Sequence, residues 1–166
     1  MLRRATAADF PFIRALAGHP DNAPFLTDEG EAALAGYVGS PEAQLLIWEA
    51  EGHAAGYALF CETRNPAGSV ELRRLALAET GGGRGQVYVR ALLDYGFSTL
   101  GAKRVWLDAS SENLRAQRTY ERAGFMPEGR LRQHWYRPTT GRTVDVMLYG
   151  MLRLEWEALE PLPARA

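Results

Sequence analysis

A glycine-rich turn is the part of this sequence whose residue types and spacing point most directly to chemistry. Four glycines stand at positions 81, 82, 83 and 85, and an amphipathic segment follows at once. Glycine has no Cβ, so several backbone N–H groups of such a turn can approach a ligand closely. They also lie at the positive end of the following helix dipole, where phosphate groups bind. The turn therefore predicts a phosphorylated ligand.

Three kinds of phosphate site compete for this turn. A Walker-type nucleotide loop needs Lys and then Ser or Thr after its last glycine, whereas Gly85 is followed by Gln86 and Val87. A dinucleotide site needs its glycines near the first strand of a βαβ unit. The glycines here stand in mid-chain, after segments that alternate like antiparallel strands. The third candidate is the pyrophosphate of coenzyme A.

The segment immediately before the turn changes its apolar phase. Val70 and Leu72 are apolar on even positions, whereas Leu75 and Leu77 are apolar on odd ones. A strand with one buried face shows this pattern when it carries a β-bulge, here near residues 73–74. A strand buried on both faces is the alternative. A bulge would splay the strand from its neighbour and free backbone groups for a ligand.

The elements that must position these residues follow from periodicity and from the turn residues between segments. Strands are predicted over residues 1–5, 44–50, 54–62, 69–77, 104–108, 126–136 and 142–151. Helices are predicted from a Thr6 cap to Gly18, from a Thr27 cap to Gly39, from the glycine turn to Gly101, and over 112–123 with Ser110 or Ser111 as N-cap. A turn is expected at 138–141, and the tail of about 157–166 is expected to fray. This order indicates an α/β (mixed α+β) single domain: a mixed sheet of six or seven strands with about four helices on both faces.

A second motif begins about 30 residues after the turn, with Asn113, Ala116, Tyr120 and Gly124-Phe125 in one helical stretch. Together the two motifs resemble the GCN5-related N-acetyltransferases (GNAT). Within that family they resemble the group like the ribosomal-protein N-terminal acetyltransferases, as do Glu128-Gly129 and the ending 145–151. The family turn opens with Arg or Gln, and Thr80 departs from that pattern. The resemblance covers nearly the whole chain.

The resemblance implies a GNAT-like domain over residues 1–166, with a β-bulge in the fourth strand and a splay between the fourth and fifth strands. It implies acetyl-CoA as the cofactor. The backbone of 75–77 would bind the pantetheine arm, and one of its N–H groups would polarise the thioester carbonyl. Amides from the turn would hold the pyrophosphate, and Arg84 would add a charged contact or be a solvated surface side chain. The implied cofactor-binding residues are Leu75, Ala76, Leu77, Gly81, Gly82, Gly83, Arg84, Gly85, Gln86, Asn113, Ala116 and Tyr120.

Tyr120 and Glu71 are the candidate catalytic residues. Asn113 and Tyr120 stand seven positions apart and so share one helix face. By resemblance, Asn113 contacts the cofactor arm and the Tyr120 hydroxyl protonates the leaving thiolate; packing with the hydroxyl at the surface is the alternative. Glu71 precedes the bulge and is the candidate base. The alternatives are that Glu71 is merely a solvent-facing carboxylate, and that water or a backbone carbonyl deprotonates the amine.

Composition limits the partners and the compartment. The net charge of −1 gives no indication of a nucleic-acid surface, and no apolar run reaches a membrane span. The single cysteine, Cys61, is expected as a small buried residue in a reducing cytoplasm, and the start of the chain lacks the long apolar run of a signal peptide. The three scattered histidines, His19, His53 and His134, lack metal-ligand spacing, so no metal is expected.

The function that these observations favour is acetyl-CoA-dependent transfer of an acetyl group to a primary amine. The alternatives are a CoA-binding sensor without turnover, and an acyltransferase with another acyl group or a hydroxyl acceptor. Protein N-termini, amino acids, polyamines, aminoglycosides and amino sugars all stay open as acceptors. By family analogy, Trp135, Tyr136, the loop 19–26 and the second helix would line the acceptor pocket, and a homodimer is compatible with such a fold.

Overall fold

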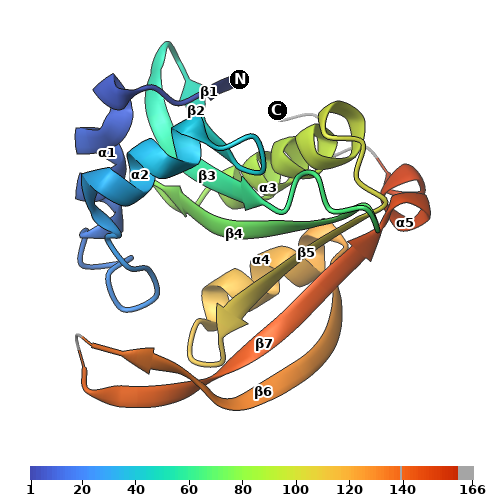
Figure 1. The fold of residues 1–166 in the computed structure, drawn as a ribbon. Helices are drawn as coiled ribbons and strands as arrows, with labels where there is room; N and C mark the ends of the chain where they lie inside the picture. Colours follow the sequence, from blue (N-terminus) through green and yellow to red (C-terminus); the bar gives the residue numbers. More distant parts are fainter. Residues whose placement is uncertain (139, 161–166) are drawn as a thin grey trace.

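A seven-stranded mixed sheet forms the centre of the protein in this computed structural model, which describes residues 1–138 and 140–160 (Figure 1). The strand order is β1-β2-β3-β4-β5-β7-β6. Only β4 and β5 pair in parallel, and the other neighbours are antiparallel. The strands are β1 (Leu2–Arg4), β2 (Gln44–Ala50), β3 (His53–Cys61), β4 (Ser69–Leu77), β5 (Arg104–Ser110), β6 (Met126–Arg137) and β7 (Arg142–Leu152). The predicted mixed sheet is confirmed.

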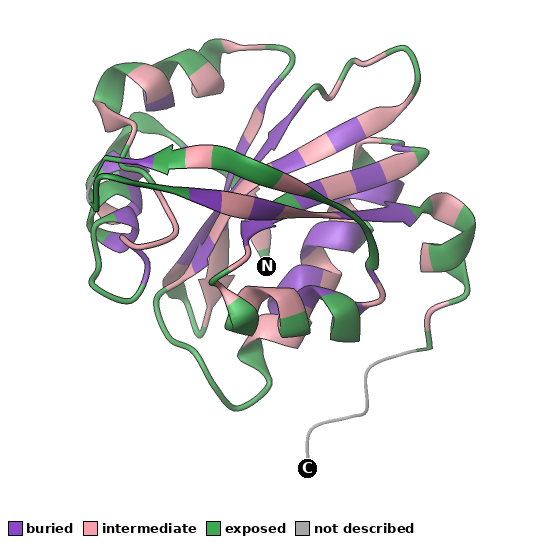
Figure 2. Ribbon diagram, turned by 90° about the horizontal axis from the view of Figure 1, so that it is seen from below, coloured by how far each residue is buried: buried purple, intermediate pink, exposed green. Residues whose placement is uncertain are grey.

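Helices cover both faces of the sheet, as predicted. A 3₁₀ turn, η1 (Ala7–Asp9), leads into α1 (Phe10–Ala17), and α1 and α2 (Gly30–Gly39) bury Ile13, Leu16 and Leu34 against one face. On the other face lie α3 (Arg84–Asp94), its π-helical continuation η2 (Tyr95–Thr99), and α4 (Leu114–Ala123). Their apolar sides form the larger core with Leu92, Phe97 and Ala123. Figure 2 shows β6 as the exposed edge of the sheet, because most of its residues are green.

The predicted bulge and splay in the middle of the sheet are both confirmed. Leu59 on β3 pairs with Arg74, whereas Phe60 pairs with Leu72, so Arg73 is the extra residue on β4. Across this bulge the strand changes phase, so that Leu72 and Leu75 both pack on the α3–α4 side. Beyond the bulge β4 leaves β5, since only 69–71 of β4 pair with 104–106 of β5. The bulge therefore opens a gap in the middle of the sheet.

The structure differs from the predicted helices at two places: one predicted helix start is wrong, and one short helix was not predicted. The second helix begins at Gly30 rather than after a Thr27 cap, and the Asp28 carboxylate accepts from the Gly30 N–H at 3.0 Å. A short fifth helix, α5 (Arg153–Glu157), follows β7 and was not predicted. An isolated helix of five residues is unstable in water, so tertiary contacts must hold α5. Trp156 stacks on Phe97 with ring centroids 5.2 Å apart.

Parts of two further predictions lie outside the described residues. The predicted turn at 138–141 includes Thr139, and the predicted frayed tail includes 161–166; neither is described. Glu157, placed in that tail, belongs to α5. Among the helices that the structure describes, none combines the length and apolar character needed to cross a membrane.

Candidate active site

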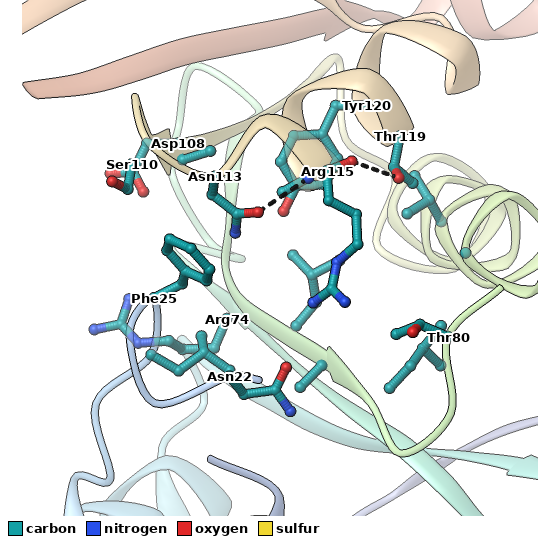
Figure 3. Close-up of a pocket in the computed structure, with 18 of the residues that line it drawn as sticks. Asn22, Phe25, Arg74, Thr80, Asp108, Ser110, Asn113, Arg115, Thr119 and Tyr120 are labelled. Atoms are coloured by element: carbon teal, nitrogen blue, oxygen red, sulfur yellow. Dashed lines mark hydrogen bonds between the residues drawn. The ribbon is translucent and has the colours of Figure 1, made fainter. Parts of the chain in front are cut away.

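The gap between β4 and β5 leads into a cavity of about 680 Å³, walled by β4, β5, α3, α4 and the segment before α2. Figure 3 shows Asn22, Phe25 and Arg74 on one side of this cavity and Asp108, Asn113 and Tyr120 on the other. Most of the residues predicted to bind the cofactor line it. These are Leu75, Ala76, Leu77, Gly81, Gly83, Gly85, Gln86, Asn113, Ala116 and Tyr120. Gly82, Arg84 and Glu71 are not among the lining residues.

The glycine turn adopts backbone conformations that only glycine takes easily. Gly81, Gly82 and Gly83 have φ of 93°, 54° and 75°, and Gly83 is the N-cap of α3. The N–H of Arg84 already donates to the Gly81 carbonyl at 3.0 Å, and that of Gln86 to the Gly83 carbonyl at 3.1 Å. Within the described chain, the N–H groups of Gly82, Gly83 and Gly85 have no backbone acceptor. The glycine amides, rather than those of Arg84 and Gln86, are therefore available to an anion.

Two arginines of α4 line the cavity, whereas the arginine chosen from the sequence does not. The guanidinium of Arg84 lies 3.3 Å from Glu79, and about half of its side chain is exposed. Arg115 and Arg122 of α4 line the cavity instead, and Figure 3 shows Arg115 reaching into it. Sequence reasoning missed both. Their spacing with Thr119, at i, i+4 and i+7, places them on one helix face and is the signal that could have found them.

Asn113 caps α4, which corrects the predicted Ser110 or Ser111 cap. Its Oδ1 accepts from the Ala116 N–H at 3.1 Å, and the helix starts at Leu114. Ser110 has another role, because its hydroxyl accepts from Arg137 at 2.6 Å. With Oδ1 engaged, the Asn113 side chain still has its NH₂ group, which makes no described hydrogen bond and belongs to a residue of the cavity wall.

Tyr120 is buried but borders the cavity, with only 6% of its surface exposed. Its ring packs edge-on against Phe125 and Tyr149, with centroids 6.0 and 5.9 Å away. No hydrogen bond of its hydroxyl occurs in the described part of the chain. Burial is the main cause that raises the pKa of Tyr120, and the nearby charge of Asp108 adds to it. The phenol therefore stays protonated and can donate a proton.

The two carboxylates nearest the bulge are in different situations. Glu71 accepts from Arg73 Nε at 2.8 Å and Nη2 at 2.5 Å, so it is held in an ion pair outside the cavity lining. Asp108 lines the cavity from β5. It is exposed to the open cavity, but the protein around its carboxylate partly desolvates it and raises its pKa. From the sequence, Asp108 was predicted only as the end of a strand. Its alternation with the fully buried Leu107 places it on the opposite face of β5 and was the available signal.

Only some of the residues predicted to line the acceptor pocket lie at the cavity. Trp135 and the loop residues Asn22, Phe25 and Leu26 line the cavity, whereas Tyr136 is exposed and no residue of α2 takes part. The guanidinium of Arg137 lies 5.3 Å from the Phe25 ring centroid and 5.1 Å from that of Trp135. This cation–π bridge joins the loop to β6.

Other reactive side chains lie apart from this chemistry. Cys61 is buried as expected, and burial raises the pKa of its thiol to about 11. It does not line the cavity. The structure describes no group of three or more His, Cys, Asp or Glu side chains arranged to hold a metal ion, within residues 1–138 and 140–160.

The family assignment agrees with this geometry. The model of the acetyltransferase (GNAT) family matches residues 7–125, which include the bulged strand, the glycine turn and all of α4. The chain belongs to the GNAT family. It is thus an N-acetyltransferase, with acetyl-CoA as the acetyl donor.

Curated relatives agree with this assignment, and a solved structure shares the fold. An uncharacterized N-acetyltransferase of Mycobacterium tuberculosis (strain H37Rv) is 32% identical over 133 residues, covering 77% of this chain and 83% of that protein. YdaF of Bacillus subtilis, provisionally named a ribosomal N-acetyltransferase, is 35% identical over only 68 residues, 41% of this chain and 36% of YdaF. Spermidine N-acetyltransferase from Vibrio cholerae, solved with CoA and spermine, shares the fold with a TM-score of 0.83. That match is 22% identical and covers 95% of this chain and 97% of the solved one.

The residues present fit the donor. The free glycine amides and the cationic Arg115 and Arg122 suit the phosphate end of CoA. The splay between β4 and β5 exposes the backbone beyond the bulge, where an extended arm can lie like an added strand. Tyr120 borders the same cavity. One continuous cavity thus combines hydrogen-bond donors for phosphate, an unpaired strand edge for the pantetheine arm and a phenol that can donate a proton.

Proposed function

We propose that this N-acetyltransferase moves the acetyl group directly from acetyl-CoA to a primary amine, with Tyr120 as general acid. One observation carries the proposal: the glycine turn, the β4–β5 gap and the Tyr120 hydroxyl border a single cavity. Holding donor and amine together there makes the reaction effectively unimolecular, which is the main gain that such a site offers.

The proposed step is simple in its atom balance. When bound, acetyl-CoA supplies a thioester carbonyl activated toward attack. The neutral amine nitrogen forms a bond to that carbonyl carbon while the carbon–sulfur bond breaks. Tyr120 donates its proton to the departing sulfur, and the nitrogen loses one proton to a base. Glu71 stays a prediction for that base, and its ion pair with Arg73 must open for it to act.

The binding residues have separate tasks in this proposal. Gly82, Gly83 and Gly85 offer amides to the pyrophosphate, and the backbone at 75–77 orients the pantetheine arm. Asn113 contacts the same arm. A contact from Arg84 to phosphate requires that it leave Glu79.

Two measurements test the proposal. Isothermal titration with acetyl-CoA and with desulfo-CoA measures binding, and failure to bind either ligand rejects it. A thiol-release assay over an amine panel, with mass spectrometry of the products, then tests turnover. Binding without thiol release would identify a sensor, and an O-acylated or longer-chain product would identify another acyltransferase.

The finer assignments belong to this proposal as well. Ribosomal-protein N-termini, suggested by the resemblance and by the partial match to YdaF, are one acceptor class to include in the panel. A cytoplasmic location and a homodimer stay predictions. Light scattering on the purified chain measures its oligomeric state.

A further inference from the structure

Two opposite charges line the cavity from either side of the gap in the sheet. Arg74 lies on β4 directly after the bulge, and Asp108 lies on β5. The parallel pairing of β4 with β5 ends at Glu71, which lies opposite Trp106. If the same register continued, Asp108 would lie opposite the bulge residue Arg73. Both side chains line the cavity, and Figure 3 shows them coming from different walls.

These two charges do not pair with each other. The described ion pairs and hydrogen bonds include no Arg74–Asp108 contact, and the Asp108 carboxylate takes part in none of them. Arg74 donates from Nη1 to the Arg73 carbonyl at 2.9 Å, and its Nη2 lies 3.8 Å from Glu29. A guanidinium has five donors, and only these two contacts occupy them in the described chain.

The charges of the cavity disfavour a polycation. Asp108 is the only acidic side chain among its described lining residues, whereas Arg73 and Arg74 contribute two positive charges at the bulge. Arg73 pairs closely with Glu71, whereas Arg74 forms a longer ion pair, with its Nη2 3.8 Å from the Glu29 carboxylate. A polyamine would bring several more positive charges beside Arg74 with a single carboxylate to receive them. An acceptor with one ammonium and one carboxylate would instead satisfy both residues.

We propose that the acceptor is a small amino acid-like molecule, held with its amine at Asp108 and its carboxylate at Arg74. This inference rests on the proposed acetyltransferase function and specifies its substrate class. Asp108 then accepts a proton from the bound ammonium, so that the free amine can attack the thioester. The carbon–nitrogen bond forms as the carbon–sulfur bond breaks, Tyr120 supplies the proton that the sulfur takes, and the nitrogen loses its second proton to the base of the proposed acetyl-transfer step.

The experiment compares matched acceptors on the full chain with acetyl-CoA. Thiol release is measured for the free amino acids, for the corresponding amino acid amides, for spermidine and for a short peptide with a neutral N-terminal residue. The amides keep the amine and lose the carboxylate. We expect kcat/KM for at least one amino acid to exceed that for its amide by tenfold or more, with spermidine lower still. Equal or better turnover of amides, peptide or spermidine overturns the inference.

A variant of Arg74 tests whether this residue binds the carboxylate of the acceptor. Arg74→Gln is expected to lower kcat/KM for the amino acid at least tenfold more than it lowers kcat/KM for its amide. Arg64→Gln, at an exposed arginine in the loop after β3, is the matched control and is expected to leave both rates unchanged. An equal loss with both acceptors in Arg74→Gln would mean that Arg74 does not bind the carboxylate, and would contradict the inference.

The outcomes also separate this inference from the proposed function. Thiol release with other amines but not with amino acids overturns the acceptor class alone. Failure to bind acetyl-CoA overturns both, and binding without release from any amine overturns the substrate class together with catalysis.

Discussion

Asp108 on β5 and Tyr120 on α4 border one cavity from two different layers of the fold, and the charge of Asp108 helps to raise the pKa of the Tyr120 hydroxyl. In the proposed reaction, this pair supplies a proton acceptor and a proton donor in the space where an amine would replace a thiolate. Neither residue is sufficient alone, because an ammonium must lose one proton before it can attack and a second as the amide forms, while the departing sulfur must gain one.

Replacing Tyr120 by Phe tests the proton donor. We expect kcat to fall about 100-fold, since that is the lower range of a general acid's contribution. Affinity for acetyl-CoA by calorimetry is expected to change little, because the ring that borders the cavity is kept and only the hydroxyl is lost. Tyr136→Phe, at an exposed residue outside the cavity, is the control. An unchanged kcat in Tyr120→Phe would exclude this tyrosine as the acid.

Replacing Gly81 by Ala tests the turn. Gly81 has φ of 93° and open space around its Cβ position, so the strain is in the backbone rather than in packing. We expect a loss of about 1–2 kcal/mol in the free energy of unfolding, together with weaker binding of acetyl-CoA because the neighbouring amides shift.

Gly52→Ala is the matched control for this change. Gly52 has φ of 82° and equally open space, and it lies in the β2–β3 turn away from the cavity. Chemical unfolding should give a similar loss, and calorimetry should give unchanged cofactor affinity. Equal affinities in the two variants would argue against a phosphate site at the glycine turn.

Substitutions of Asn113 separate its two tasks. Asn113→Ala removes the cap of α4 and is expected to lower the free energy of unfolding by about 1 kcal/mol. Asn113→Asp keeps a capping oxygen, so its stability should return close to that of the native protein. If the NH₂ group contacts the cofactor arm, acetyl-CoA affinity should be reduced in both variants. Native affinity in Asn113→Asp would reduce the role of this residue to the cap.

Acid should weaken the fold through Asp9. Hydrogen bonds from Arg3, at 2.8 and 2.9 Å, hold the pKa of Asp9 at about 2, below the usual carboxyl value. A lowered folded-state pKa means that the stabilisation is complete above the unfolded-state pKa of about 3.9 and is lost as the pH falls toward about 2. Its size is roughly 2 kcal/mol.

Urea unfolding from pH 7 to pH 2 measures this contribution. The native protein and Asp9→Asn should differ in the free energy of unfolding at pH 7 and converge as the pH falls. Asp21→Asn, at an exposed carboxylate, should differ little at any pH. A difference between native protein and Asp9→Asn that persists at pH 2 would contradict the assignment.

The sequence by itself determined the features that depend on local periodicity and steric freedom. The phase change between Leu72 and Leu75 predicted the bulge, because side chains alternate along a strand and an extra residue shifts them. The glycines predicted the turn, because positive φ is easy only without a Cβ. The spacing of the α4 residues predicted one helix face along the cavity.

Only the tertiary structure decided which residues from different elements come together at the cavity. Arg74 and Asp108 stand 34 positions apart (108 − 74), and a parallel pair of strands that diverges after three residues brings them to one cavity. The ion pair that occupies Glu71, the cap at Asn113 and the docking of α5 on Phe97 likewise depend on packing between elements. Local pattern shows which face of a strand or helix a residue occupies, but it carries no information about the partner on the other side of the gap.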